Sequence, residues 1–168
     1  VSANVAWMVA SGYPNWIQFT STSGNSNGST TIECAPNPSS FSRSAILTFE
    51  GGGQTATLSV TQSGAAPSLA VTPNNHAFAA SGGDHTFTVT GNVPWTLSNP
   101  PAWLNFSTLS GANNGGFTAT CSANNGTTSR SAQFTLQGGG QTVILNITQQ
   151  GQAPQVSVSP TSMTFSAA

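Results

Sequence analysis

The side chains able to carry acid–base chemistry are few and widely separated. The set comprises three acidic residues and two histidines: Glu33, Glu50, Asp84, His76 and His85. A carboxylate pair that hydrolyses a glycosidic bond needs two carboxyl groups roughly 5–10 Å apart, one on each side of the sugar, and no spacing in this set indicates such a pair. Asp84-His85 follows Ser81 in the turn SGGDH, where a Ser-His-Asp triad would need a nucleophile elbow that is not there. The sequence therefore predicts a protein that is not an enzyme and needs no cofactor.

Two cysteines, Cys34 and Cys121, stand at equivalent places in the two copies of an internal repeat described below. A disulfide between them would have to join two separate cores, which the required Cα separation forbids. We expect each cysteine to be a buried free thiol that packs as a small hydrophobe. The duplication also argues against a metal site, because a metal needs several ligands in one place.

The four tryptophans divide into two kinds. Trp95 alternates in phase with Val93 and Leu97, so we expect it in a core, together with its counterpart Trp7. Trp16 and Trp103 are out of phase with the apolar residues that follow them, so simple alternation turns them away from the apolar face.

An exposed indole is a platform for a pyranose ring, and Tyr13 lies close to Trp16 in the sequence. Trp16, Trp103 and Tyr13 are therefore candidate glycan-binding residues. The alternative is that each indole caps an end of a domain under a loop, with its N–H bonded to a carbonyl.

Arg43 and Arg130 each follow a turn and precede a strand. A guanidinium there can recognise a carboxylated sugar, or it can satisfy loop carbonyls while its stem packs across a sheet edge. The flanking serines are typical of turns and favour the structural interpretation.

Composition excludes several classes of partner. Only 3% of the 168 residues are charged, lysine is absent and the net charge is −1, so the chain offers no basic surface for nucleic acid or anionic lipid. No apolar run reaches the length of roughly 20 residues that crosses a bilayer. No signal peptide is visible at the start VSANVAW, which we interpret as a cut inside a longer protein. The abundance of Thr, Asn and Gly favours a secreted or cell-surface protein.

The chain is a tandem repeat. A shift of 87 places aligns Trp16 with Trp103 and Arg43 with Arg130 without a gap, and before Trp16 a shift of 88 aligns Trp7 with Trp95. The predicted boundaries are residues 1–66 for a first unit that lacks its first strand, 67–153 for a complete second unit, and 154–168 for the first strand of a third unit. The proline-containing linkers predict units held semi-rigidly, end to end.

Short runs with period-two alternation, and no helical period, predict about seven strands in each repeat of about 87 residues. The first strand of the second unit is broken by Pro73, and Gly138–Gly140 turns the last hairpin. Asn114-Gly115 and Asn125-Gly126 indicate further turns with positive φ. The predicted fold class is all-β, with tandem immunoglobulin-like antiparallel β-sandwiches.

These features resemble those of a known family. The segment GNVPWTLSNPPAWLNFSTLSGANNGGFTATCSANNGTTSRSAQFTLQGGGQTVILNITQ resembles the BACON family of bacterial immunoglobulin-like domains, in its Trp after the second strand, its W-L pair, its S-R-S-A strand entry and its terminal I-T-Q. The resemblance implies secreted or surface-anchored bacterial proteins, often found beside glycan-degrading enzymes. It also implies a proposed role in binding carbohydrate or mucin, and it supplies no catalytic motif.

Two functions remain open. The first is a non-catalytic structural or adhesive repeat, acting as a stalk, spacer or filament subunit. The incomplete front unit and the spare strand at the rear are what head-to-tail strand donation between copies requires. The candidate donor side chains are Val156, Val158, Met163 and Phe165. The alternative is a long array of repeats that has been cut at arbitrary places, which also explains the incomplete first and third units. The second function is a carbohydrate-binding module.

Overall fold

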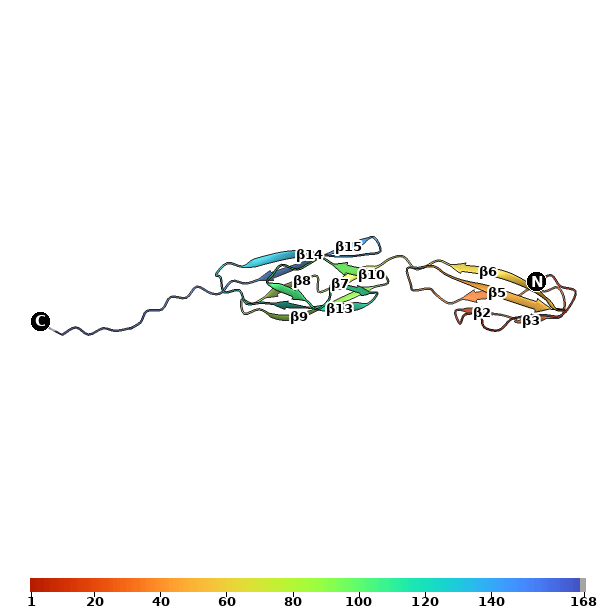
Figure 1. Ribbon diagram of the computed structural model, residues 1–168, viewed down its shortest axis with the longest axis horizontal. Coiled ribbons are helices and arrows are strands. Elements are labelled where there is room, and N and C mark those ends of the chain that lie inside the picture. The colour runs from red at the N-terminus through yellow and green to blue at the C-terminus, as the bar shows by residue number, and fades with distance from the viewer. Residues whose placement is uncertain (167–168) are drawn as a thin grey trace. The chain divides into compact units, whose positions relative to one another are not determined.

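The computed structural model describes residues 1–166, and every regular element among them is a β-strand, as the sequence predicted (Figure 1). The chain divides into two compact units, unit 1 (Val1–Ser68) and unit 2 (from Leu69 onward). No helix that could cross a membrane occurs in this described part. The six strands of unit 1 repeat the order of the last six strands of unit 2, so these can be compared strand by strand.

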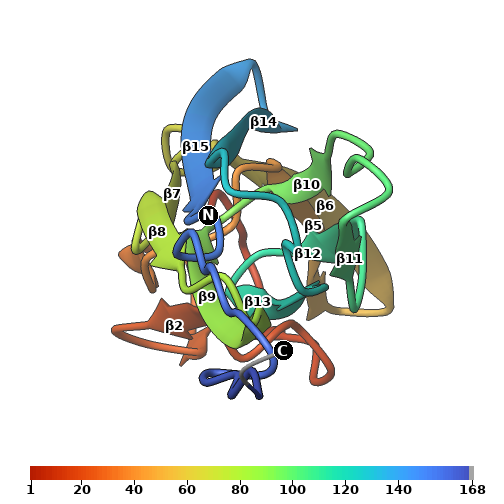
Figure 2. The ribbon, with the colours of Figure 1, turned by 90° about the vertical axis from the view of Figure 1, so that its left-hand side faces the viewer.

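Unit 2 contains nine strands in two sheets. In chain order they are β7 (Leu69–Thr72), β8 (Asn75–Phe78), β9 (Gly83–Gly91), β10 (Pro94–Leu97), β11 (Leu104–Phe106), β12 (Ser110–Ala112), β13 (Gly115–Cys121), β14 (Arg130–Gly138) and β15 (Gln141–Gln149). One sheet has the order β12-β10-β14-β15-β8 and the other β11-β13-β9-β7. Figure 2 shows β14 and β15 on one side of the unit and β9 and β13 on the other. This is the predicted sandwich, with β12 as a short extra strand.

The core of unit 2 follows from the alternation of side chains along the strands, because every second residue faces the opposite sheet. Its buried members are Val71, Phe78, Phe87, Val89, Trp95, Leu97, Leu104, Phe106, Phe117, Ala119, Cys121, Phe134, Leu136, Leu145 and Ile147. The rings of Phe87 and Phe117 stack with centroids 5.0 Å apart at its centre. Hydroxyl and amide side chains occupy most of the outward positions.

Pro73 breaks the first strand of unit 2 and moves the chain from one sheet to the other. Before it, β7 pairs antiparallel with β9; after it, β8 pairs with β15 in the opposite sheet. The pairing of β8 with β15 is parallel, with His76 opposite Ile147 and Phe78 opposite Gln149. The sequence predicted antiparallel sheets, and that prediction is wrong for the pairing of β8 with β15.

The last hairpin of each unit turns on two glycines in the left-handed region. Their φ angles are 56° and 77° at Gly139 and Gly140, and 56° and 73° at Gly52 and Gly53, as a two-residue hairpin with matching twist requires. The prediction of a left-handed turn at Asn114-Gly115 is wrong, because Gly115 already pairs with Val89 as the first residue of β13. The left-handed residue at that turn is Asn113, with φ 56°.

Unit 1 contains six strands: β1 (Trp7–Val9), β2 (Ile17–Phe19), β3 (Ser23–Gly24), β4 (Ile32–Cys34), β5 (Arg43–Gly51) and β6 (Gln54–Gln62). The sheet β3-β1-β5-β6 repeats β12-β10-β14-β15, and β2-β4 repeats β11-β13. Among residues 1–68 no strand takes the places of β7, β8 and β9. Unit 1 is therefore a sandwich with one side open.

Cys34 shows the effect of that opening. The prediction that both cysteines are buried holds for Cys121 and is wrong for Cys34, which is exposed. Cys121 lies against Gly83 of β9, whereas β4 pairs with β2 alone. Burial also raises the pKa of the Cys121 thiol, an effect that the nearby Arg130 partly opposes, so that thiol stays protonated and inert.

Residues 154–166 are exposed and contain no strand. They make up the described part of the predicted third segment, and its last two residues lie outside the described residues. The side chains of the donor candidates are correspondingly exposed: 100% for Val156, 72% for Val158, 69% for Met163 and 82% for Phe165.

Candidate functional site

A tryptophan–arginine–glutamine cluster lies at the same place in both units. In unit 2 the guanidinium carbon of Arg130 lies 4.7 Å from the ring centroid of Trp103. The Arg130 Nε donates to Oε1 of Gln149 at 2.8 Å, and its Nη2 donates to the carbonyls of Ser122 (3.0 Å) and Ala123 (3.3 Å). Arg130 thereby joins the end of β14 to β15 and to the loop after β13.

Gln149 completes this cluster from inside the sandwich. Its side chain is fully buried, and Nε2 is within hydrogen-bond distance of three carbonyls, those of Ala79 (3.2 Å), Ala80 (3.2 Å) and Ser122 (2.9 Å). Because a buried amide needs partners for both its oxygen and its nitrogen, Arg130 and the loop carbonyls together make the burial of Gln149 tolerable.

In unit 1 the cluster repeats with fewer contacts. The guanidinium carbon of Arg43 lies 4.4 Å from the ring centroid of Trp16, and its Nε donates to Oε1 of Gln62 at 2.8 Å. Its Nη2 donates to Ala35 and Pro36, as Arg130 does to the equivalent carbonyls. Gln62 donates to Ala35 at 3.0 Å and is only half-buried, since unit 1 contains no counterpart of Ala79 and Ala80 among its residues.

This arrangement bears on the glycan-binding candidates. Trp16 and Trp103 are half-buried, and a guanidinium covers one face of each indole, which leaves less ring surface for a sugar. Tyr13 is also half-buried, with its ring edge-on to Phe19 at a centroid distance of 4.9 Å. Trp16 and Tyr13 belong to unit 1 and Trp103 to unit 2. Sequence patterns did not predict that each arginine stacks on a tryptophan. The only signal was that Trp16 and Arg43 have the same separation along the chain as Trp103 and Arg130.

Trp7 and Trp95 are buried, and each indole N–H donates to a loop carbonyl, that of Ser26 at 2.8 Å for Trp7 and that of Asn113 at 3.1 Å for Trp95. A glycine lies beneath each ring. A Cβ at Gly111 would be 2.4 Å from the Trp95 ring and one at Gly24 would be 2.7 Å from the Trp7 ring. These two tryptophans therefore belong to their cores, and Trp7 also borders a hollow of unit 1 described below.

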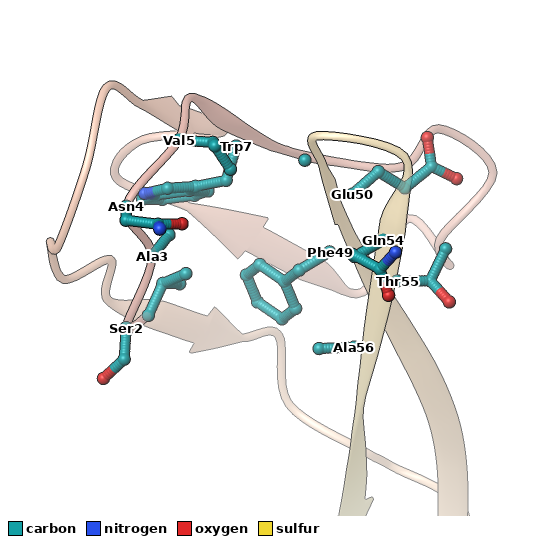
Figure 3. A pocket seen from close by; sticks show the side chains of 12 residues that line it. Ser2, Ala3, Asn4, Val5, Trp7, Phe49, Glu50, Gln54, Thr55 and Ala56 are labelled. Atoms are coloured by element: carbon teal, nitrogen blue, oxygen red, sulfur yellow. The ribbon is translucent and has the colours of Figure 1, made fainter.

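The open side of unit 1 forms two adjoining hollows. The first, of about 200 Å³, is lined by residues 1–5 and by side chains of β5 and β6, and the ring of Phe49 points into it opposite Ala56 (Figure 3). The second, of about 370 Å³, shares Phe49 and Ala56 and extends to Ile32 and Leu58. Both hollows lie where unit 2 is closed by strands.

The acidic residues do not converge. Glu50 borders the first hollow, while Glu33 lies exposed on β4 and Asp84 exposed on β9 of the other unit. Within residues 1–166 no three His, Cys, Asp or Glu side chains gather as metal ligands.

The two histidines stack on each other between β8 and β9. Their ring centroids are 3.6 Å apart with an interplanar angle of 16°, and the rings of Phe78 and Phe87 surround them. The Nε2 of His85 is buried without a hydrogen-bond partner in the described part of the chain. Burial, and secondarily the neighbouring His85, lower the pKa of His76. The folded state thus favours an uncharged His76.

Unit 2 should lose stability in mild acid. Because the pKa of His76 is lower in the folded than in the unfolded chain, the unfolded state binds more protons as the pH falls below about 6.5. The stability is therefore complete above that pH and declines below it. We expect the Tm of unit 2 to fall by roughly 2–5 °C between about pH 7.5 and pH 5.5. The control His76→Phe keeps an aromatic ring on β8 and should flatten the pH profile, and an unchanged slope would contradict the argument.

Comparison with known proteins identifies both units. The model of the BACON family, described as "Putative binding domain, N-terminal", matches residues 5–63 and 93–150. No curated protein sequence matches the chain.

Three solved structures are among those that match part of the chain. A GH5 xyloglucanase of Bacteroides ovatus, solved with an XXXG heptasaccharide, is 27% identical over 51% of this chain and 19% of its own, with a TM-score of 0.47. The S-layer protein rSbsC is 19% identical over 92% of this chain and 21% of its own, with a TM-score of 0.42. An endo-fucoidan hydrolase of glycoside hydrolase family 107 is 11% identical over 90% and 24%, with a TM-score of 0.35. The chain thus spans about a fifth to a quarter of these proteins, and at such scores the likeness says nothing about function.

Proposed function

This chain belongs to the BACON family, and we propose that it is a non-catalytic structural repeat of a secreted or cell-surface bacterial protein, acting as a stalk, spacer or filament subunit. The observation that carries this proposal is the repetition of the tryptophan–arginine–glutamine cluster. In both units the guanidinium covers an indole and bonds to loop carbonyls and to a glutamine of the last strand. The chemically capable side chains therefore tie loops and strands together within each unit.

The surface supports the same proposal. The outward positions of the strands carry mostly hydroxyl and amide side chains, and only 3% of the residues are charged. Such a surface stays hydrated without attracting nucleic acid or anionic lipid. The partners we propose are neighbouring copies of the repeat or adjacent domains of a longer protein.

A second candidate function is glycan binding, in line with the family's description as a binding domain. The observation that favours it is the partial exposure of Trp16 and Trp103. The uncovered part of each indole can meet an apolar sugar face, and polysaccharide or mucin glycans are the ligands we consider.

The variant Trp103→Ala separates the two functions. If the indole is structural, the variant should lower the stability of unit 2 by about 2–3 kcal/mol, because the ring packs on the core beneath Arg130. The intact chain should then show no change in tryptophan fluorescence across a panel of neutral and acidic polysaccharides and mucin glycans. If the indole binds glycan, one member of the panel should quench the fluorescence with a Kd between about 1 μM and 1 mM. Calorimetric titration with that glycan, which does not depend on the replaced fluorophore, should then show no binding to a folded Trp103→Ala variant.

The matched control is Trp103→Phe, which keeps an aromatic ring under the guanidinium. The spacer function is supported if this variant regains the stability of unit 2 and if no glycan of the panel changes the fluorescence of the intact chain. Calorimetric binding of the glycan that survives in the folded phenylalanine variant and is lost in the alanine variant would assign the site to sugar stacking.

A further inference from the structure

The stacked histidines connect the two sheets of unit 2 at one side of the sandwich. His76 belongs to β8, the last strand of the five-stranded sheet, and His85 belongs to β9 of the opposite sheet. These two strands share no ladder, so they meet through their side chains. The contact between the two rings, with centroids 3.6 Å apart, is therefore part of what holds β8 against the other sheet.

The surroundings of the stacked histidines are apolar. The ring of Phe78 lies edge-on to His76 with centroids 4.5 Å apart, and the ring of Phe87 lies edge-on to His85 at 5.0 Å. The register partner of His76 on β15 is the fully buried Ile147. A proton added to His76 in the closed unit would therefore bring positive charge among apolar side chains, where an unpaired charge is costly.

The other ionisable side chains of unit 2 offer His76 no counter-charge. Within residues 69–166 they are Asp84, Cys121 and Arg130. Asp84 is exposed on the outward face of β9, the opposite face to that of its neighbour in the stacked pair. Cys121 is buried, and that burial raises the pKa of its thiol. Arg130 is itself positive and bonds to Gln149 and to loop carbonyls.

The ladder that holds β8 in its sheet is short. β8 pairs with β15 over four residues, and no strand of the described chain pairs with its other edge. Two of the backbone bonds at this edge run from the amides of Asn146 and Gln150 to the carbonyls of Asn74 and Phe78, each at 3.0 Å. Separation of β8 therefore breaks a single ladder and leaves the pairing of β14 with β15 intact.

The chain on either side of β8 is held by other contacts. After it, the Nε2 of Gln149 lies 3.2 Å from the carbonyls of Ala79 and Ala80, and the amide of Asn124 donates to Ala80 at 2.7 Å. Before it, β7 is paired with β9 in the opposite sheet. Residues 74–78 can therefore separate from β15 between two fixed points, as small cooperative segments of folded proteins do.

We propose that mild acid releases residues 74–78 from β15 while the other strands of unit 2 stay folded, and that His76 is the side chain that senses the pH. In the released segment its ring reaches water, so a charge on it costs less there than in the closed unit. Burial and His85 lower the pKa of His76 in the closed unit. The closed ladder is therefore fully favoured above about pH 6.5 and progressively less favoured below it. This inference goes beyond both proposed functions, because it concerns unit 2 whatever that unit binds.

Native-state hydrogen exchange on the complete chain tests the proposal, because the amides of β15 alternate between two neighbouring strands. The amides that face β8 are those of Asn146, Thr148 and Gln150, and those that face β14 are those of Leu145, Ile147 and Gln149. At about pH 5.5 we expect the amides that face β8 to exchange through a local opening that depends little on urea. Those that face β14 should be better protected and exchange with the larger urea dependence of global unfolding.

The pH dependence of the same amides identifies the side chain that senses the pH. Between about pH 7.5 and 5.5 the protection of the amides that face β8, corrected for intrinsic rates, should fall about three- to tenfold. Tenfold is the ceiling for one imidazole that is charged only in the open form. His76→Phe should remove this fall. The matched control is Asp84→Asn, which replaces a charged side chain beside the pair on the outward face and should leave the fall in place.

Two results would overturn the proposal. The first is equal protection and equal urea dependence for both sets of amides at about pH 5.5, since β8 would then leave only when the whole unit unfolds. This comparison needs no substitution, so it stands even if a variant does not fold. The second is a fall in protection that persists in folded His76→Phe. Neither result bears on the spacer or the glycan-binding function, which are judged by the glycan panel and the Trp103 variants.

Discussion

Arg130→Ala should destabilise unit 2 by about 3 kcal/mol, whereas Arg43→Ala should destabilise unit 1 by about 1 kcal/mol. Removing Arg130 leaves the Oε1 of a fully buried Gln149 without its donor and removes the cation from the face of Trp103. The same change in unit 1 uncovers Gln62, which is half-buried and can turn to water. The difference in destabilisation between Arg130→Ala and Arg43→Ala therefore reports how much more deeply Gln149 is buried than Gln62.

The measurement is chemical denaturation followed by hydrogen exchange, which assigns each transition to its unit. Arg130→Lys is the informative control, because it retains the charge and loses the planar fork that reaches Gln149 and two carbonyls at once. It should recover less than half of the loss. Equal costs for Arg43→Ala and Arg130→Ala would contradict the role given to Gln149.

The second large effect concerns the matched leucines of the last strand. Leu145→Ala should cost unit 2 about 3–5 kcal/mol, because the side chain is fully buried and leaves a cavity between two sheets. Leu58→Ala should cost unit 1 less than about 1 kcal/mol, since the side chain is 43% exposed beside an open hollow. Few sequences allow the same substitution to be compared at equivalent positions with and without a covering strand.

Equilibrium unfolding in urea provides the free energies for both variants, with the m-value as a check that the unfolded state is unaltered. The control is Leu109→Ala, at a side chain of unit 2 that is 37% exposed, for which only a small change is expected. A cost for Leu58→Ala as large as that for Leu145→Ala would mean that the open side of unit 1 is closed in solution.

Much of the fold could be predicted because period-two alternation depends only on which residues are apolar. That pattern gave the strands of the second unit and the interruption at Pro73, and the duplication showed that the first unit begins part-way through the repeat. The turns of the last hairpins could also be predicted from their glycines, because few other residues adopt left-handed φ angles.

Other features depend on contacts that no local pattern encodes. The parallel pairing of β8 with β15 joins residues about 70 positions apart and follows from how the chain crosses between sheets after Pro73. The alternation of apolar residues around Cys34 predicted that its side chain is buried. It is exposed because the strands that cover Cys121 in unit 2 have no counterpart among residues 1–68. The stacking of Arg130 on Trp103 arises because the first residue of β14 meets the loop before β11. The sequence of either segment alone does not indicate this contact.

The parallel ladder between β8 and β15 has a mechanical consequence. A force that stretches the chain pulls β8 at its amino end and β15 at its carboxyl end. Because the two strands run in the same direction, that force shears the ladder, and its four register pairs from Asn75–Asn146 to Phe78–Gln149 resist together instead of opening one at a time. Among residues 1–68 β6 has no such neighbour, so this resistance to shear belongs to unit 2.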